Sequence, residues 1–596
     1  MTEATQVRPQ SLSRTALDIH YYVSMPQPSS HLFEVTLQIK GWHADVLDLK
    51  MPVWTPGSYL VREYARHLQE FQAEGERSLS WQKLSKNHWQ IATPATSDIT
   101  VRYRIYANEL TVRTNHLDST HAYFNGAALF FYIPGFEHHP LHVTIVLPKP
   151  EWRIATPLPS VASEPNTFEA IDFDTLVDSP FEVGLHFHCE FEVLGKPHEF
   201  VIWGMGNAEP EQIVADTQKI IEVEAALFGG LPYDRYLFLL HLATQGFGGL
   251  EHKNSCSLIY SRFGFRNEER YYRFMQLVAH EFFHLWNVKR IRPKALEVFN
   301  YEGENYTPSL WFSEGTTSYY DLVLPMRAGI YDARTFLKNL SKEISRYLTI
   351  PGRHIQALSE SSFDAWIKLY RRDANSDNSQ ISYYLKGEMV SLLLDLQIRS
   401  KFHNQRSLDD VMRQMWQQFG QLEIGFTPEQ LQTVIESVAE ESLSDFFQRY
   451  LHTTEDLPFD SYLTLFGLRL QPEDNHHLPP FLGLTAKSEN GREIIKFVEV
   501  GSPAQQAGLD SEDELLAING LRVKAAELSD RLRDFYPGEL IYISVFHQDE
   551  LCTYPVTLGE PRPASYQLVA VESPTSEQQQ ALEGWLGVAW DKMWLS

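Results

Sequence analysis

The sequence predicts a multidomain α+β protein with a β-rich amino-terminal part, a mainly helical middle part and a smaller third unit. Three observations support this prediction. Apolar and polar residues alternate at 33–40 and 99–106, apolar residues repeat at spacings of three and four between about 208 and 455, and Pro479-Pro480 introduces a new pattern. A chain of 596 residues is also long enough for several domains.

The alternating stretches indicate half-buried antiparallel strands. Residues 15–205 are therefore predicted to form an antiparallel β-sandwich-like domain, preceded by a disordered segment at 1–14. A polar and aromatic segment at 115–126 lies between the strands. It is either a long loop that packs on itself or a loop that reaches over a cleft.

The middle part begins with a helix predicted at 210–228, which Gly229 and Gly230 end. Two short apolar stretches, 236–242 and 257–262, are predicted to be strands.

Between these two strands lies the glycine-rich stretch Gly246-Phe247-Gly248-Gly249-Leu250-Glu251-His252. Glycines allow a backbone to approach a substrate closely. An edge strand here, with Gly248 and Gly249, is predicted to bind a peptide by strand addition. The alternative is a glycine-rich turn with a solvated Glu251.

The strongest functional signal is Ala279-His280-Glu281-Phe282-Phe283-His284, which reads H-E-x-x-H in a helical pattern. Residues four apart share one face of a helix, so His280 and His284 can both direct a ring nitrogen at one zinc ion. Glu281 borders this face and is suited to take a proton from a water molecule. The alternative is a pair of ordinary helix histidines, but an amphipathic stripe beside them places the pair at the edge of a core.

A two-histidine zinc site needs a third protein ligand and an open position. Glu314, in the stretch Leu310-Trp311-Phe312-Ser313-Glu314-Gly315, is the natural candidate on a helix of its own. The alternative, a solvated helix glutamate, is disfavoured by the bulky apolar residues around it.

These motifs together resemble the gluzincin aminopeptidases, and in particular the glycyl aminopeptidase family of zinc peptidases that carry a PDZ domain. H-E-x-x-H is followed by L-W-x-x-E-G, and the resemblance runs in order from about residue 15 to 560. Four further stretches are similar to that family: Pro52-Val53-Trp54-Thr55-Pro56-Gly57-Ser58-Tyr59, Gly248-Gly249-Leu250-Glu251-His252, Trp286-Asn287-Val288-Lys289-Arg290-Ile291-Arg292-Pro293 and Tyr383-Tyr384-Leu385-Lys386-Gly387.

The resemblance implies one zinc ion held by His280, His284 and Glu314, with Glu281 as general base. It also implies that Glu251 holds the free amine of the substrate and that small amino-terminal residues, glycine or alanine, are preferred. Leu250 and His252 depart from the larger aminopeptidase group, which has methionine and asparagine at these places. The spacing from His284 to Glu314 is longer than in that group, and residues 289–307 are expected to loop out.

A helix is predicted at 382–401, and its start carries Tyr383 and Tyr384. A phenol can donate a hydrogen bond to an oxyanion. The register of the family's Y-x-K-G favours Tyr384 for this role, and the alternative is that both tyrosines only pack in a core.

The third unit begins with Phe481-Leu482-Gly483-Leu484, which resembles the carboxylate-binding loop of PDZ domains. The stretches 501–509 and 513–520 also match PDZ domains, although Glu512 stands where those domains usually have glycine. The resemblance implies a peptide carboxyl terminus as a possible ligand.

The predicted limits follow from these patterns. The thermolysin-like, mainly helical catalytic domain spans 206–460, a linker spans 461–477, the PDZ domain spans 478–560, and 561–596 docks back through Trp585, Trp590 and Trp594.

A formal net charge of -26 argues against nucleic acid and anionic membranes as partners. Neither a secretory signal nor a run long enough to cross a membrane is recognised. Cys189, Cys256 and Cys552 are far apart and imply no disulfide framework, which suits the cytoplasm.

The sequence thus favours a zinc aminopeptidase acting on peptides with a free amino terminus. One alternative is a non-catalytic PDZ scaffold with a retained metal site, which an intact Glu281 and Tyr384 argue against. The other is a zinc endopeptidase, which cleavage of a blocked peptide would favour.

Overall fold

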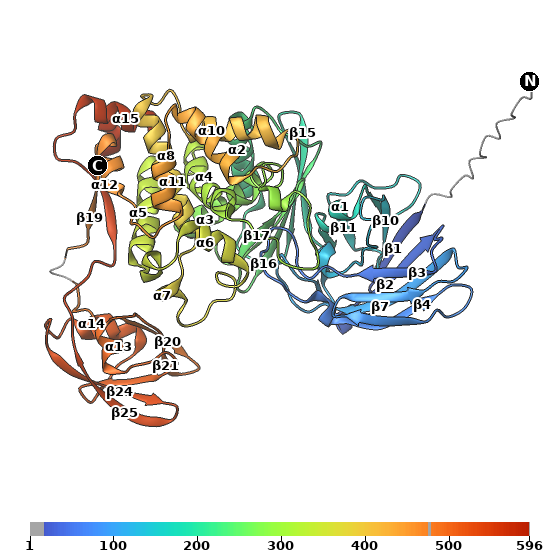
Figure 1. Cartoon of the computed structure of the whole chain (residues 1–596), viewed down its shortest axis with the longest axis horizontal. Helices are drawn as coiled ribbons and strands as arrows, with labels where there is room; N and C mark the ends of the chain where they lie inside the picture. The colour runs from blue at the N-terminus through green and yellow to red at the C-terminus, as the bar shows by residue number, and fades with distance from the viewer. Residues whose placement is uncertain (1–16, 475–477, 595–596) are drawn as a thin grey trace, which may run out of the picture.

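The computed structural model describes residues 17–474 and 478–594, so the predicted disordered segment at 1–14 lies outside the described residues. Figure 1 shows three parts: a β-rich region in blue, a helical body in green, yellow and orange beside it, and a small orange unit below the far end of the body. The multidomain α+β prediction, with a β-rich amino-terminal domain and a helical middle region, is confirmed.

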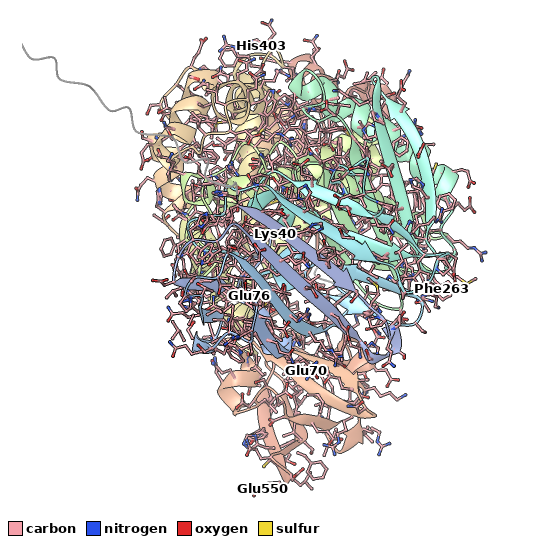
Figure 2. All side chains as sticks on the ribbon, turned by 90° about the vertical axis from the view of Figure 1, so that its right-hand side faces the viewer. Lys40, Glu70, Glu76, Phe263, His403 and Glu550 are labelled. Carbon is pink, nitrogen blue, oxygen red and sulfur yellow. The ribbon has the colours of Figure 1, made fainter. Side chains whose placement is uncertain are left out.

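The amino-terminal region contains three sheets around one apolar core. Figure 2 looks onto the six-stranded sheet, whose strand β2 ends at Lys40. The six-stranded sheet has the order β12-β10-β1-β2-β7-β4, and only β1 and β10 pair in parallel among its described strands. The strands of the three sheets are β1 Asp18–Ser24, β2 Leu32–Lys40, β4 Leu68–Glu74, β7 Asp98–Tyr106, β10 Leu141–Val146 and β12 Thr167–Ala170; β3 Val46–Lys50, β5 Trp81–Ser85 and β6 His88–Ala92; and β8 His116–Leu117, β9 His121–Phe124, β11 Arg153–Ala155 and β13 Phe181–Gly184.

The alternation of apolar and polar residues explains why this region forms strands with one buried face. In β2 every second side chain is buried, from Phe33 to Ile39, and its neighbour β7 repeats the pattern from Ile99 to Ile105. One face of each strand therefore packs in the core while the other meets solvent.

The segment 115–126 is neither of the two predicted loops. It forms the β8–β9 hairpin, which joins β13 in a four-stranded sheet. All four residues of β9 are buried, which explains why the segment is so aromatic.

A five-stranded sheet precedes the helical body, in the order β14-β15-β16-β18-β17. Its strands are β14 Phe187–Val193, β15 Lys196–Trp203, β16 Tyr236–Ala243, β17 Phe247–Glu251 and β18 Ser255–Ser261. Two of them precede residue 206, so this sheet begins before the predicted catalytic limit. β17 pairs only with β18 among the described strands and is antiparallel to it, so it lies at the sheet edge.

The helical body packs beside this sheet, with α3, α4 and α8 at its centre (Figure 1). Asn267 caps the first turn of α3, and Ser382 caps α8. The helices are α1 Phe173–Val177, α2 Pro210–Phe228, α3 Glu268–Phe283, α4 Thr317–Arg327, α5 Ala333–Thr349, α6 Leu358–Phe363, α7 Ser376–Ser379, α8 Tyr383–Lys401, α9 Leu408–Met415, α10 Pro428–Ala439, α11 Ser444–Leu451 and α12 Phe459–Leu463.

The expectation that residues 289–307 loop out is wrong. This segment is a bridge to the β-rich region: Tyr301 is buried in the amino-terminal core, and its carbonyl accepts a hydrogen bond from the Val53 amide at 2.9 Å. The Trp54 indole donates to the Asn300 carbonyl at 2.7 Å. Leu296 and Tyr301 are buried, whereas Val298 and Tyr306 are exposed, so the segment is anchored at particular residues. Its aromatic and backbone groups find partners in a neighbouring domain, which spacing along the chain does not reveal.

The predicted linker 461–477 contains the end of α12 and the strand β19 Leu468–Pro472. β19 pairs with β26 Tyr566–Ala570, so the chain returns to the body after the third unit. There α15 Ser576–Leu586 buries Trp585, whose indole donates to the Tyr319 hydroxyl at 3.2 Å, whereas Trp594 in α16 Trp590–Trp594 is partly exposed.

The third unit is a sheet with two short helices, and Glu550 marks its far end in Figure 2. Its elements are β20 Leu484–Glu489, β21 Arg492–Val498, α13 Pro503–Ala507, β22 Glu514–Ile518, β23 Leu521–Arg522, α14 Leu528–Leu532, β24 Leu540–His547 and β25 Glu550–Thr557. It touches the body at α7, where the Asn378 amide donates to the Val498 carbonyl and its oxygen accepts from the Val500 amide.

Within residues 17–474 and 478–594, no helix has the length and apolar character that a membrane crossing requires.

Candidate functional site

The end of α3 presents the two histidines of the H-E-x-x-H motif on one face. The rings of His280 and His284 lie with centroids 4.6 Å apart and nearly perpendicular planes. Tyr271, Met275 and Phe282 are buried on the apolar side of the helix. The amphipathic pattern thus fixes the helix rotation that turns both imidazoles toward one point.

Glu314 reaches this point from a π-helical turn, Trp311–Thr316, that leads into α4. One of its carboxylate oxygens lies 3.1 Å from His284 Nε2 and 3.6 Å from His280 Nε2. Burial raises the pKa of Glu314, but the adjacent His284 and His280 outweigh this effect and hold the pKa at about 2. The carboxylate is therefore ionised and acts as an acceptor.

The other ring nitrogen of each histidine is held by the protein. His280 Nδ1 lies 2.8 Å from an Asp321 carboxylate oxygen, and His284 Nδ1 lies 2.6 Å from the Asn287 carbonyl. Metal-binding histidines usually donate their second N–H in this way, which fixes the tautomer and the ring orientation. The donor atoms of His280, His284 and Glu314 lie within 4.8 Å of one another. Two imidazoles and one carboxylate with fixed outer partners suit a catalytic zinc ion.

A close contact between two glycines brings Glu314 and Tyr384 to the same site. A Cβ on Gly315 would lie 2.5 Å from the Cα of Gly387, so neither position has room for a side chain. The π-helical turn can therefore pack directly on α8. Tyr384, in the first turn of α8, lies with its ring centroid 6.3 Å from that of His280.

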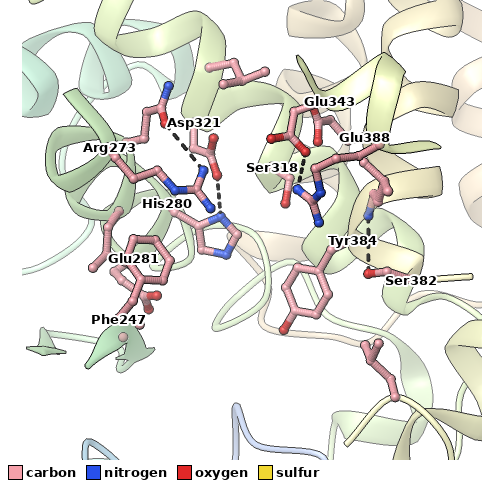
Figure 3. Close-up of a pocket in the computed structure, with 18 of the residues that line it drawn as sticks. Phe247, Arg273, His280, Glu281, Ser318, Asp321, Glu343, Ser382, Tyr384 and Glu388 are labelled. Carbon is pink, nitrogen blue, oxygen red and sulfur yellow. Dashed lines mark hydrogen bonds and ion pairs between the residues drawn. The ribbon is translucent and has the colours of Figure 1, made fainter. Parts of the chain in front are cut away.

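Tyr384 and Glu281 lie on opposite sides of His280 in the cavity drawn in Figure 3. The Tyr384 hydroxyl is hydrogen bonded to the Tyr370 hydroxyl at 2.9 Å. Tyr383 is fully buried and does not line this cavity.

Glu281 packs against the glycine-rich edge strand. A Cβ on Gly249 would lie 2.2 Å from the carboxyl carbon of Glu281, so a side chain there would collide with it. Burial raises the pKa of Glu281 to about 7, although His280 and His284 lower it. One of its oxygens has no hydrogen-bond partner among the residues that the structure describes.

Glu251 ends β17 and is buried beside Glu281. Donor atoms of Glu251, Glu281 and His284 lie within 4.8 Å of one another. Gly57 abuts the Glu251 carboxylate from the turn after Trp54: its φ is +85°, and a Cβ there would lie 2.6 Å from Glu251 Oε1. This turn favours glycine both for its left-handed backbone and for space.

The cavity that His280, Glu281 and Tyr384 line has a volume of about 350 Å³. Phe247, Gly248 and Gly249 form one wall, and Glu343 and Glu388 lie at the far side (Figure 3). Burial, with Glu343 and Asp321 nearby, raises the pKa of Glu388 well above its usual value.

Several residues at the site were not identified from the sequence. Arg113 comes from the β-rich region, lines the cavity and donates to the Gly249 carbonyl at 2.9 Å. No local pattern marks it. Asp321 lies seven residues after Glu314, two helical turns on, so it shares a helix face that the sequence does reveal. Tyr370 lies in a stretch without a motif.

In the third unit, the predicted carboxylate-binding loop precedes β20, which is an edge strand. The carbonyls of Leu482 and Gly483 accept hydrogen bonds from Ala504 and Glu499, and the Arg562 guanidinium lies 3.9 Å from the centre of the Phe481 ring.

Comparisons with known proteins agree with this architecture. The Peptidase M61 N-terminal domain matches residues 20–185, and M61 glycyl aminopeptidase matches residues 273–390. No curated protein sequence matches the chain.

Among solved structures, the chain is similar to an aminopeptidase N family protein from Idiomarina loihiensis, with 34% identity and a TM-score of 0.90, over 95% of this chain and 100% of that one. It is more distantly similar to an M1 zinc metallopeptidase from Deinococcus radiodurans, with 13% identity and a TM-score of 0.47, over 74% of this chain and 96% of that one. The chain therefore belongs to the M61 glycyl aminopeptidase family and is a metallo-aminopeptidase.

Proposed function

We propose that the protein is a zinc-dependent aminopeptidase that releases small amino-terminal residues, glycine or alanine, from peptides. The observation that carries this proposal is the position of the buried Glu251 carboxylate beside Glu281 and His284. A carboxylate at this place pairs with the protonated amino terminus of a peptide. Only one residue then fits between the amine and the reacting carbonyl, which makes the enzyme an exopeptidase.

One catalytic zinc ion would be held by His280, His284 and Glu314. Zinc in such a site polarises a carbonyl and makes water more acidic. The preference for zinc is supported by the donor set and by the outer partners Asp321 and Asn287.

The side chains around this site have separate tasks. Glu281 takes a proton from the attacking water and passes it to the leaving amine. The Tyr384 hydroxyl donates a hydrogen bond to the oxyanion that develops at the scissile carbonyl. Gly248 and Gly249 offer the edge-strand backbone to the substrate, and Arg113 holds that strand through the Gly249 carbonyl.

The test compares alanyl and N-acetylalanyl p-nitroanilides. Wild type should cleave only the free amine. Glu251→Ala should lose about 2–5 kcal/mol of transition-state binding for it, seen in kcat/KM, because the substrate ammonium then lacks a partner. Equal cleavage of both substrates by wild type would overturn the proposal. A panel of glycyl, alanyl, leucyl and arginyl substrates tests the preference for small residues.

We further propose that residues 478–560 are a PDZ domain that binds a peptide carboxyl terminus. The support is the edge position of β20 after the loop Phe481-Leu482-Gly483-Leu484. Glu512 adopts a left-handed backbone with φ of +69°, so it fills the position of the usual glycine without removing the turn. Peptides with free and amidated carboxyl termini, compared by fluorescence polarisation, test this assignment: equal binding contradicts it.

A cytosolic location stays a prediction, and the free thiols of Cys189, Cys256 and Cys552 support it.

A further inference from the structure

A second histidine cluster lies in the β8–β9 hairpin, outside the residues that line the active-site cavity. It consists of His116, Asp118 and His121, and we name it the hairpin cluster. Its donor atoms lie within 4.8 Å of one another. His121 is fully buried, and His116 is 9% exposed.

His121 has one ring nitrogen engaged and the other bare. Its Nδ1 lies 2.9 Å from a carboxylate oxygen of Glu182 on β13. Its ring stacks on Trp203 with centroids 3.5 Å apart, so the ring plane is fixed. Its Nε2 is buried and finds no hydrogen-bond partner in the part of the chain that the structure describes. A buried nitrogen lone pair without a partner is costly unless it has a ligand.

The arrangement of His121 repeats that of the catalytic histidines, whereas His116 Nδ1 has no partner among the described residues. In the catalytic histidines too, Nδ1 is held by an acceptor of the protein, and Nε2 faces the remaining donors. A histidine that gives its second N–H to a carboxylate is the usual form of a metal ligand. Glu182 would therefore be the outer partner of His121.

Asp118 supplies the negative charge of the cluster. Its Oδ2 lies 3.2 Å from His116 Nε2, close to the 3.1 Å between the Glu314 carboxylate and His284 Nε2. Its Oδ1 is used differently and accepts hydrogen bonds from the Thr120 amide and hydroxyl and from the His121 amide. Burial raises the pKa of Asp118, but the bonds from Thr120 outweigh it, so the pKa is well below its usual value. The Asp118 side chain is 31% exposed, which gives an ion access from solvent.

A neighbouring arrangement shares His121 but is already satisfied. Glu182 bonds His121 through Oε1 and His241 on β16 through Oε2, each at 2.9 Å. An ion there would have to displace both hydrogen bonds, whereas an ion at the hairpin cluster would replace only the one between His116 and Asp118 and would use the unpartnered Nε2 of His121. The two carboxylates, Asp118 and Glu182, also balance the charge of a divalent ion.

We propose that His116, Asp118 and His121 form a second divalent-metal site of the zinc class, separate from the catalytic centre. Two imidazoles and one carboxylate are its protein ligands, and solvent at the Asp118 side completes the coordination. Through Glu182 and His241 the site ties the hairpin of the β-rich region to the five-stranded sheet that carries β17.

The test counts zinc bound to metal-free protein by titration against a chromophoric chelator. Wild type should bind about two equivalents, and Glu314→Ala, which lacks a catalytic ligand, should keep about one. Asp118→Asn should bind about one, and the double variant none. Asn at 118 keeps the oxygen that holds the Thr120 turn, so the fold is preserved, and circular dichroism checks this.

A second readout does not depend on activity. Cobalt added to Glu314→Ala should give the visible absorption of a protein-bound ion, and the same band should be absent when Asp118→Asn or His116→Gln is added. One equivalent in wild type and none in Glu314→Ala would overturn the second site while leaving the catalytic zinc intact. A residual ion in Glu314→Ala that survives both hairpin substitutions would overturn it as well.

Discussion

The catalytic centre and the hairpin cluster use the same donors on different scaffolds. In the catalytic centre, both histidines come from one helix and the third donor from a neighbouring turn. In the hairpin cluster, His116, Asp118 and His121 come from one short β-hairpin, and the outer partner Glu182 lies on the neighbouring strand β13. The decisive difference is what surrounds the donors. The catalytic centre opens on a cavity of about 350 Å³ that Glu281 and Tyr384 line, whereas the ring of His121 is closed in by Glu182 and Trp203. The same kinds of metal ligand can therefore form a catalytic site where a substrate cavity adjoins them, or a structural site where the protein closes around them.

The largest expected difference between the two regions comes from Glu281→Gln. Removing the base should lower kcat by about 10²–10⁴-fold, because the proton of the attacking water then has no acceptor. Zinc content, measured by elemental analysis, should be unchanged, since Glu281 is not a ligand. The matched control is Glu182→Gln beside the hairpin cluster, which should leave kcat close to that of wild type. Substantial turnover by Glu281→Gln would show that its role is misassigned.

The next effect is that of Tyr384→Phe. Loss of one donor to the developing oxyanion should lower kcat by about 10²–10³-fold with little change in KM. Tyr383→Phe is the control, because Tyr383 does not line the cavity and its hydroxyl contacts the outer partner Tyr370, at 3.4 Å. If the two variants exchange these results, the assignment is off by one residue.

A pair of substitutions compares the outer partners directly. Asp321→Asn should weaken zinc binding at the catalytic centre by about 10–100-fold, since His280 loses the charged acceptor of its Nδ1 proton. Glu182→Gln should weaken binding at the hairpin cluster by a similar factor. Competition with chelators of graded affinity measures both. An effect of Asp321→Asn on both sites would mean that they are not independent.

The smallest effect concerns the helix that carries the catalytic histidines. The Asn267 side chain accepts a hydrogen bond from the Arg270 amide at 3.0 Å. Asn267→Ala should lower the free energy of unfolding by about 1 kcal/mol, while Asn267→Asp should keep the cap. Denaturant unfolding measures this, and kcat at a temperature well below unfolding should be the same in both variants. A fall in kcat for Asn267→Ala alone would show that fraying reaches the metal site.

Local periodicity and motif order made much of this architecture predictable. The helix at 210–228 and the strands near 236 and 257 appear almost where they were expected, because their apolar patterns are strong and Gly229 ends the helix. The relation of His280 to His284 follows from helix geometry alone. Glu314 followed from the need for a third zinc ligand, whereas the roles of Glu251 and Tyr384 were identified through family resemblance. The structure brings both glutamates to His284 and places Tyr384 in the cavity with His280.

The rest depends on contacts between distant segments. Arg113 reaches the site from another domain, and the bridge around Tyr301 is buried because the β-rich region offers it partners. His116 and His121 lie in a segment that the sequence singled out, but their neighbour Glu182 comes from β13 of the same sheet, about 60 residues later, and Glu182 bonds His241 of another sheet. The spacing of residues along the chain does not reveal such contacts between distant segments.

The contact between Gly315 and Gly387 has a mechanical consequence. Because backbone touches backbone there, the separation of Glu314 and Tyr384 is set by two main chains and not by flexible side chains. A small shift of α8 would carry the π-helical turn with it, so Glu314 and Tyr384 would move together as one rigid unit. Glu281 and Glu251 belong to the other side of the site, on α3 and β17. A metal ion held by His280 and His284 at the end of α3 and by Glu314 would join the two sides.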